Sequence, residues 1–216
     1  MNTPIIQTTS DGSSTLFMPN LNESYHSVNG AITESKFVFI DAGFRALNRS
    51  TECIKVLEIG FGTGLNAFLT ALESEEIDTT IYYTGIELFP LSLDIINQLN
   101  FNDKKGILYK MHETSWEIYR KISERFFLRK IEADFTNYQP DEKYDLIYFD
   151  AFSPNVQPEL WTEPLFRKLF ELMNFGGILT TYCAKGQVRR NMQQAGFSVE
   201  RLPGPPGKRE MLRSRK

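Results

Sequence analysis

Cysteine and histidine are scarce in this sequence: Cys53, Cys183, His26 and His112 are the only ones among 216 residues. Two cysteines cannot build the disulfide framework of a small secreted domain, so we expect a reducing compartment and two cysteines that serve in packing. No cluster of cysteine and histidine has the spacing of metal ligands. The sequence therefore predicts a protein without a metal site.

Long apolar runs are missing as well. No run approaches the roughly 18 residues that a membrane helix needs, and residues 1–7 lack the basic and then apolar pattern of a signal peptide. There are no internal repeats, low-complexity tracts or linkers. We therefore expect a cytoplasmic protein without a membrane partner, folded as a single domain over 1–216 in which an extension (1–50) precedes a core (51–216).

Positive charge is unevenly distributed along the chain. The formal net charge is -3, yet residues 183–216 carry nine basic and two acidic side chains, which gives +7 there and -10 in the remainder. Such asymmetry indicates either a basic patch that binds phosphates or a solvated C-terminal surface. The residues leave both interpretations open.

The most informative stretch is Val56–Asn66, VLEIGFGTGLN, in which an apolar run leads into glycines at positions 60, 62 and 64. Leu65, Phe68, Leu69 and Leu72 then follow the spacing of one helix face. The pattern predicts a buried strand, a tight turn and a helix, and the turn leaves backbone N–H groups free for a ligand.

The rest of the chain alternates in the same way, which predicts an α/β fold with a largely parallel sheet covered on both faces. Before the central strand we expect a hairpin over 5–18 and a helix over 31–47. After it, the pattern predicts strands at 81–86, 126–133, 144–149, 178–182, 198–202 and 210–213. Helices are predicted over 91–99, for most of 103–124, from Thr162 to Gly176-Gly177, and around 188–195, the last stopped by Gly196.

Acidic residues recur where these strands end, at Glu58, Glu87, Asp134 and Asp150. Ligands of parallel sheets bind outside the carboxyl ends of the strands, and clustered carboxylates repel one another unless something offsets them. The recurrence indicates a binding site, although each acid taken singly could also cap a turn.

The glycine spacing decides between ligands. A dinucleotide fingerprint needs a glycine three residues after the second, where Leu65 stands, and no Gly-Lys-Ser/Thr follows for a P-loop. Glu-x-Gly-x-Gly-x-Gly resembles the first motif of class I S-adenosylmethionine-dependent methyltransferases. That resemblance implies S-adenosylmethionine on Glu58, Gly60, Gly62 and Gly64, with Glu87 at the ribose hydroxyls and Asp134 at the adenine amino group.

The segment Asp150–Trp161, DAFSPNVQPELW, is more distinctive. It resembles the methyltransferase half of the bifunctional bacterial enzymes that complete 5-methylaminomethyl-2-thiouridine at the tRNA wobble position, with Ala151 in place of the usual glycine. The runs 188–190, 195–197 and 207–212 match too, as do Asp11-Gly12, 25–27, 30–31 and Glu34. The resemblance covers essentially the whole chain and implies a Rossmann-like, doubly wound sheet with an antiparallel C-terminal strand, preceded by a small hairpin and helix.

The same resemblance implies the reaction and its residues. A methyl group would pass from S-adenosylmethionine to the primary amine of 5-aminomethyl-2-thiouridine in tRNA. The other half of the bifunctional enzymes is a flavin-dependent oxidase, which this sequence does not match, so no flavin is expected. Asp150 would orient the amine, unless it is a turn-forming residue. The substrate-contacting candidates are Tyr25, His26, Phe152, Ser153, Pro154 and Trp161, with Arg189, Arg190, Lys208 and Arg209 on the tRNA backbone. Trp161 could instead anchor its helix to the core, His26 could make a structural hydrogen bond, and His112 is expected to be exposed.

Three other functions stay open at this point. The chain could methylate a protein or a small amine, it could be an aminopropyltransferase that uses a similar sheet, or it could be a binding module with a degenerate nucleotide pocket. The intact glycines and acids disfavour the last. Nothing in these residues indicates an oligomeric state.

Overall fold

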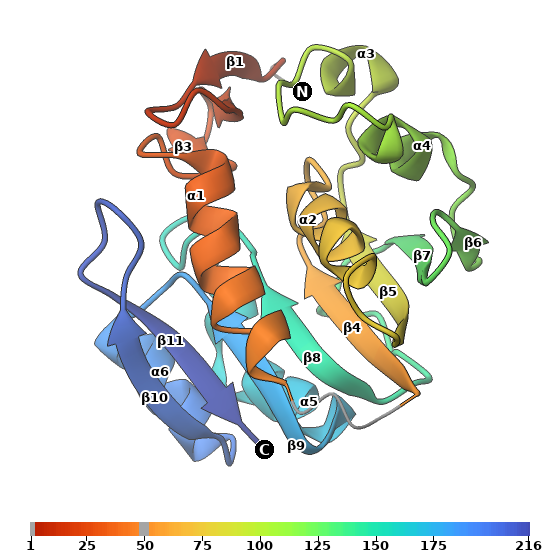
Figure 1. Cartoon of the computed structure of the whole chain (residues 1–216). Helices are drawn as coiled ribbons and strands as arrows, with labels where there is room; N and C mark the ends of the chain where they lie inside the picture. Colours follow the sequence, from red (N-terminus) through yellow and green to blue (C-terminus); the bar gives the residue numbers. More distant parts are fainter. Residues whose placement is uncertain (1–2, 48–51) are drawn as a thin grey trace.

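An eight-stranded mixed sheet forms the centre of the computed structural model, which describes residues 3–47 and 52–216 (Figure 1). The strand order is β10-β11-β9-β8-β4-β5-β7-β6. The five strands from β9 to β7 run parallel, and β6, β11 and β10 are antiparallel to their neighbours. The strands are β4 (Cys53–Ile59), β5 (Thr80–Glu87), β6 (Arg120–Lys121), β7 (Phe126–Glu132), β8 (Tyr144–Phe149), β9 (Met173–Thr181), β10 (Ser198–Pro203) and β11 (Glu210–Arg215). The predicted α/β class is confirmed.

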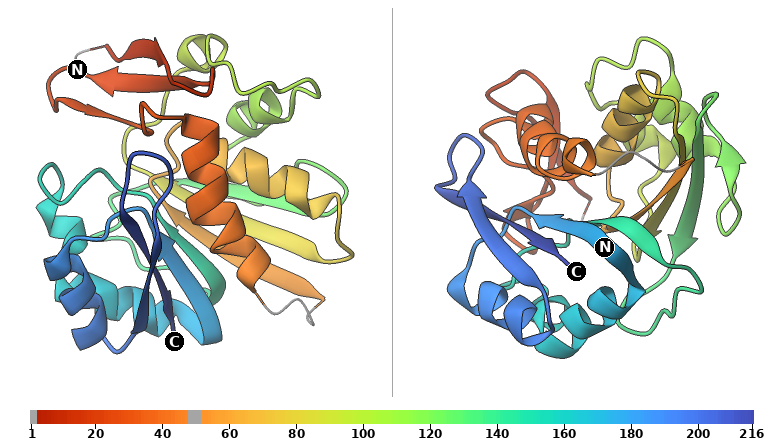
Figure 2. Two further views of the ribbon diagram at one scale, coloured as in Figure 1. Left: turned by 60° about the vertical axis from the view of Figure 1, so that its left-hand side comes forward. Right: turned by 60° about the horizontal axis from the view of Figure 1, so that its bottom comes forward.

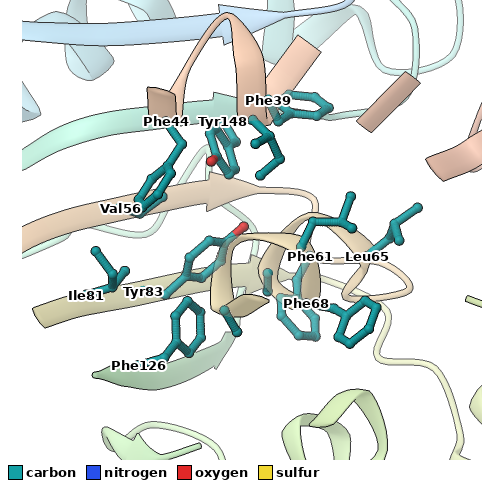
Figure 3. Packing of buried hydrophobic residues seen from close by; sticks show 14 of the residues in the cluster. Phe39, Phe44, Val56, Phe61, Leu65, Phe68, Ile81, Tyr83, Phe126 and Tyr148 are labelled. Atoms are coloured by element: carbon teal, nitrogen blue, oxygen red, sulfur yellow. The ribbon is translucent and has the colours of Figure 1, made fainter. Parts of the chain in front are cut away.

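Helices cover both faces of this sheet, as Figure 2 shows. On one face lie α1 (Ala31–Ser35), its continuation as a π-helix (Lys36–Asp41) and α2 (Leu65–Ser74); on the other lie α5 (Glu163–Leu172) and α6 (Gly186–Gln194). Two buried clusters result, one for each face. In the first, Phe39 and Phe44 pack toward Tyr148 while Phe61, Leu65 and Phe68 approach Tyr83 from the α2 side (Figure 3). Large aromatic side chains fill this layer, which explains the many phenylalanines of the chain.

A small second sheet lies over the end of the main sheet toward which β4, β5 and β8 run (Figure 1). The predicted hairpin is present as β1 (Ile5–Thr8) and β2 (Ser14–Met18), and β3 (Glu23–Ser24), which the sequence did not predict, pairs with β2. The short helices α3 (Leu93–Ile96) and α4 (Ile107–Glu113) lie beside it. The N-terminal segment thus covers the edge at which a ligand of a parallel sheet binds.

Several predicted boundaries are wrong. The helix expected over 31–47 changes to a π-helix at Lys36 and ends in a 3₁₀ turn (Phe44–Ala46); residues 48–51, expected to separate it from the sheet, lie outside the described residues. The helices expected over 91–99 and 103–124 are reduced to α3 and α4, and Arg120–Lys121 is a strand.

The helix expected to end at Gly176-Gly177 ends instead at Leu172, and β9 runs through both glycines. Gly176 has φ +79°, and a Cβ on Gly177 would lie 2.9 Å from the carbonyl oxygen of Asn174. The pair therefore serves a bulge in the strand, seen as a register shift between Tyr144 and Leu146 of β8. Gly196 follows α6 with φ +111°, as predicted for a residue that ends a helix.

Candidate active site

A cavity of about 370 Å³ opens at the carboxyl ends of β4, β5 and β8. Its floor comes from the strand ends and the glycine turn, and its roof comes from β3 and the segment that follows it. Of the predicted site residues, nine line it: Tyr25, His26, Gly60, Gly62, Glu87, Asp134, Asp150, Phe152 and Lys208. The other predicted site residues do not line the cavity.

The glycine turn brings β4 against β8. Gly60 has φ +88°, and a Cβ there would lie 2.6 Å from the carbonyl oxygen of Asp150. Gly62 has φ +50°, and its Cβ would lie 3.1 Å from the ring of Tyr25. Only glycine permits both the conformation and the approach. Gly64 does not line the cavity, contrary to prediction, because it precedes α2 and faces His112.

Glu87 lies at the end of β5 and faces this turn. Its carboxylate accepts hydrogen bonds from the backbone N–H groups of Gly62 (2.8 Å) and Phe89 (2.9 Å), and burial raises its pKa. Leu88 and Phe89 line the same wall and are 41% and 53% exposed. The wall therefore combines a carboxylate with exposed apolar surface, as a nucleoside requires.

Asp134 follows β7 and fits both interpretations offered for it. Its Oδ1 atom accepts hydrogen bonds from the backbone N–H (2.8 Å) and hydroxyl (2.7 Å) of Thr136, so the residue shapes a turn. The same side chain belongs to the cavity lining. Capping and ligand contact are compatible here because a carboxylate has lone pairs for both.

The predicted contact of Glu58 with the ligand is wrong. It is fully buried and does not line the cavity; its carboxylate accepts hydrogen bonds from Asn66 (2.8 Å) and from the Tyr83 hydroxyl (2.8 Å). Burial, and next the charge of Asp150, raise the pKa of Glu58 well above its usual range. Glu58 supports the site from behind, through Asn66.

Asn66, which the sequence analysis missed, connects this buried acid to the cavity. Its Nδ2 group also donates to Asp150 Oδ2 at 2.8 Å. Burial, and next the charge of Glu34, raise the pKa of Asp150 to about 7, against the opposing effects of Asn66 and Lys208. Asp150 is therefore a carboxyl group that can hold or release a proton near neutral pH.

The loop after Asp150 is held from two sides. Ser153 donates from its backbone N–H (3.1 Å) and hydroxyl (3.0 Å) to Glu23, and Trp161 Nε1 donates to the Phe152 carbonyl (2.8 Å). Trp161 is 3% exposed and packs against Phe149. Trp161 therefore packs in the core, which is the alternative offered for it, and it does not line the cavity; Ser153 and Pro154 do not line the cavity either.

Both histidines bind Thr63 of the glycine turn. A hydrogen bond of 2.7 Å joins His26 Nε2 to the Thr63 hydroxyl, and His112 Nε2 donates to the Thr63 carbonyl at 2.9 Å. Burial lowers the pKa of both imidazoles to about 4. His112 is thus not the exposed residue that we expected, and the N-terminal segment and α4 together hold the turn.

These lowered pKa values predict a pH dependence of stability. In the unfolded chain His112 binds a proton below its pKa of 6.5, whereas in the folded protein it stays neutral down to about pH 4. The free energy of unfolding therefore falls as the pH is lowered from 6.5 to 4. His112→Gln keeps a donor for Thr63, and we expect its slope against pH to be smaller by up to one proton. Denaturant titrations across this range measure it. Raised carboxyl pKa values act equally in both proteins and cancel, so identical slopes would contradict the assignment.

The basic residues divide into paired and unpaired groups. Arg213 and Arg215 lie near Glu200, and Arg201 lies near Glu210, so much of the C-terminal charge is neutralised locally. Lys208 lines the cavity and forms an ion pair with Glu34. Among the described residues, the side chains of Arg189, Arg190 and Arg209 have no carboxylate partner, but none of the three lines the cavity. They can act only outside the cavity.

Within residues 3–47 and 52–216, no group of three His, Cys, Asp or Glu side chains could hold a metal ion. No helix in these ranges is both long and apolar enough to cross a membrane. Sequence analysis missed Glu23, Asn66 and Tyr182 as residues of the site or its support, and it named Glu34 only as part of the matching N-terminal pattern, without a role. Asn66 had a local signal, since it lies two residues after the last glycine of the turn; the others come close to the site only through the fold.

Comparison with known proteins fits this geometry. Residues 114–216 match a family described as S-adenosyl-L-methionine-dependent methyltransferase. The crystal structure of MnmC2 from Aquifex aeolicus is 25% identical, with a TM-score of 0.83, and the match covers 100% of this chain and 71% of that chain. The chain has the class I S-adenosylmethionine-dependent methyltransferase fold. The resemblance and the fold predicted from the glycine turn and the Asp150 segment are confirmed.

The chain is also similar to a bifunctional tRNA-modification protein in sequence and to a spermidine synthase in fold. The tRNA 5-methylaminomethyl-2-thiouridine biosynthesis bifunctional protein MnmC of Campylobacter hominis is 30% identical over 207 residues, which are 92% of this chain and 31% of that protein. The chain spans about a third of the length of the curated relatives it matches. Spermidine synthase from Thermotoga maritima is 13% identical with a TM-score of 0.58, covering 100% of this chain and 73% of that one, which is a likeness of fold alone.

Proposed function

We propose that this protein is a tRNA methyltransferase that converts 5-aminomethyl-2-thiouridine at the wobble position into 5-methylaminomethyl-2-thiouridine. The observation that carries the proposal is the Asp150 carboxyl group, which lies in the cavity beside the glycine turn and has a pKa of about 7. The names of the MnmC relatives supply the nucleoside. A cytoplasmic location belongs to the same proposal.

The residues present fit S-adenosylmethionine. Gly60 and Gly62 line the cavity without side chains, Glu87 and Asp134 offer carboxylates to hydroxyl and amino groups, and Leu88 offers an apolar surface. When bound, S-adenosylmethionine supplies an electrophilic methyl group on a positively charged sulfur. An acid-lined cavity suits that charge.

Asp150 has the first chemical task. An alkylammonium group such as that of lysine has a pKa of about 10.4 and cannot act as a nucleophile until it loses a proton. A carboxylate with a pKa near 7 accepts that proton about 3 pKa units more readily than an ordinary aspartate, which lowers the cost of transfer by about 4 kcal/mol. The raised pKa therefore brings deprotonation within reach at neutral pH.

The protein then positions the neutral amine. The nitrogen lone pair forms the new N–C bond as the S–CH₃ bond breaks, and the product is a secondary ammonium with S-adenosylhomocysteine as the leaving group. The Asn66 hydrogen bond fixes the orientation of Asp150. Tyr25 and Phe152 pack edge to face, with ring centroids 5.1 Å apart, and together form one aromatic wall of the cavity against which a planar base can lie. Such alignment supplies most of the rate in a transfer of this kind.

The test of the function is methyl incorporation. The purified protein and labelled S-adenosylmethionine are incubated with tRNA from cells that lack the methylation step, and we expect label in the wobble nucleoside. Matched tRNA without the aminomethyl group should take up none. Label in protein or in free amines, or transfer of an aminopropyl group from decarboxylated S-adenosylmethionine, would instead support one of the other enzymes considered above.

We predict that Arg209 contacts the tRNA backbone. Its side chain is exposed in the loop next to Lys208 and has no carboxylate partner among the described residues. Arg209→Gln should reduce the slope of log affinity against log salt by about 0.8, since one phosphate contact is lost. Arg125→Gln is the control, because Arg125 precedes β7 and pairs with Asp78 at the far end of the sheet. Equal slopes for both variants would place the RNA elsewhere.

A further inference from the structure

The cavity lining carries a large excess of acidic side chains. Its lining includes six carboxyl side chains and, among the described lining residues, a single ammonium group, that of Lys208. The carboxyl groups belong to Glu23, Glu34, Glu87, Asp134, Asp150 and Glu159. Such a lining favours a cationic group and excludes phosphate. The part of a nucleic acid that enters must therefore be its positively charged substituent.

The carboxyl groups differ in what they hold. Glu87 accepts backbone N–H groups, Asp150 accepts the amide of Asn66, and Glu23 accepts Ser153. Glu34 instead holds an alkylammonium. Its Oε1 atom accepts a hydrogen bond from Lys208 Nζ at 2.6 Å, while Oε2 accepts the backbone N–H of Ser27 at 2.8 Å.

The two members of this ion pair are unequally fixed. The Glu34 side chain is 9% exposed and lies in α1, whereas the Lys208 side chain is 31% exposed and comes from the loop between β10 and β11. Lys208 Nζ also lies 3.9 Å from the ring centroid of Tyr182. Removing the cation from a buried ion pair leaves an uncompensated charge, so Glu34 favours a replacement cation, and the more exposed partner is the one that can be exchanged.

We propose that Glu34 determines specificity for the substrate amine: it binds the aminomethyl group as an ammonium ion, and Lys208 is its exchangeable counter-ion in the substrate-free protein. This rests on the proposed function and deepens it. A substrate R–CH₂–NH₃⁺ has the same terminal chemistry as the lysine side chain and can replace it at Glu34. The displaced Lys208 side chain lies in the same loop as Arg209, where its ammonium group can form an ion pair with a tRNA phosphate.

The exchange preserves the charge balance around Asp150. Glu34 raises the pKa of Asp150 and Lys208 lowers it, and the substrate ammonium that replaces Lys208 at Glu34 supplies the same positive charge. The other polar and charged groups around Asp150 are Asn66 from α2, Glu58 from β4, Tyr83 from β5 and Tyr182, which directly follows β9, and none of these has to move. Binding at Glu34 thereby brings the ammonium into the cavity that Asp150, the group that takes the proton, also lines.

The experiment compares two anticodon stem-loop RNAs that are identical except that one carries 5-aminomethyl-2-thiouridine and the other 2-thiouridine. Affinities are measured by calorimetry in saturating S-adenosylhomocysteine. We expect the wild-type protein to prefer the aminomethyl RNA by a factor of about 10 to 100, typical of a hydrogen bond between charged groups. Glu34→Gln, which can still accept the Ser27 N–H, should bring this ratio close to one. Lys208→Met should weaken both RNAs but increase the ratio.

Glu159→Gln is the matched control, because it removes one carboxylate from the exposed rim of the same cavity and should keep the wild-type ratio. Affinity for S-adenosylhomocysteine should be equal in all variants. An unchanged ratio in Glu34→Gln, a wild-type ratio near one, or a Glu34→Gln protein that also loses S-adenosylhomocysteine would each overturn the inference. A wild-type protein that shows the preference but transfers no methyl group would overturn the proposed function and leave the role of Glu34 supported.

Discussion

Replacing Asp150 with asparagine is expected to lower the rate of methyl transfer by a factor of about 100 to 10,000, the usual contribution of a positioned general base. The amide can still accept the Asn66 hydrogen bond, so the geometry behind the site is kept. What is lost is the acceptor for the ammonium proton. Single-turnover methyl transfer to aminomethyl tRNA at saturating S-adenosylmethionine measures the effect.

Two controls separate lost chemistry from lost structure. The wild-type rate should fall as the pH drops below about 7, because protonated Asp150 cannot accept a proton, and the Asp150→Asn rate should lack this limb. The folded pKa of Asp150 lies above the unfolded value of 3.8, so its charge disfavours the folded state above pH 7. The variant should therefore melt at an equal or higher temperature at pH 8, with affinity for S-adenosylmethionine within about twofold. Unchanged turnover would remove Asp150 from the mechanism.

The strand ends were readable in the sequence because their signal is local. Glu87 is the last residue of β5 and Asp150 follows the last residue of β8, and both line the cavity. Glu58 has the same acidic signal but lies one residue inside β4, where successive side chains alternate between faces, and it points into the core. The composition of a strand end predicts a site, whereas the exact position within the strand decides which acid faces it.

Glu34 could not be assigned from local pattern. Its partner Lys208 lies 174 residues further along the chain, and the two meet only because the loop between β10 and β11 folds back onto α1. Gly207, with φ +85°, permits that approach, since a Cβ there would lie 2.0 Å from the Asn29 side chain. Contacts of this sequence separation depend on the tertiary fold, which no periodicity of 2 or 3.6 residues encodes.

The segment 103–124 was assigned incorrectly for a different reason. Its helix, α4, is short because Asp103 accepts the N–H groups of Ile107 and Leu108 (2.9 and 2.8 Å) and so fixes the start, while Thr114 is already extended. The following residues reach the sheet as β6, which pairs with β7 through two residues. Polar composition without a hydrophobic period indicated a weak helix, and sheet pairing overrode it.

Gly60→Ala is the structural change with the largest expected effect on methyl-donor binding. An L-residue at φ +88° costs about 1–2 kcal/mol, and the new Cβ would lie 2.6 Å from the Asp150 carbonyl oxygen, which adds about 1–3 kcal/mol of overpacking. The ends of β4 and β8 must then separate, although the Asp150 N–H donates a hydrogen bond of 3.0 Å to the Ile59 carbonyl there. We expect a melting temperature lower by about 10 °C, together with a loss of S-adenosylmethionine affinity of at least tenfold.

Gly176→Ala distinguishes the close approach from the backbone conformation. Gly176 has φ +79°, close to that of Gly60, but its Cβ would meet nothing within 4 Å, and it lies in the bulge of β9, away from the cavity. This variant should lose only about 4 °C and bind S-adenosylmethionine, measured by calorimetry, as the wild type does. If Gly60→Ala also kept its affinity, the contact between the glycine turn and the Asp150 backbone would not determine the shape of the methyl-donor site. If both variants lost it, overall stability rather than local geometry would control binding, because the two substitutions share only the left-handed backbone.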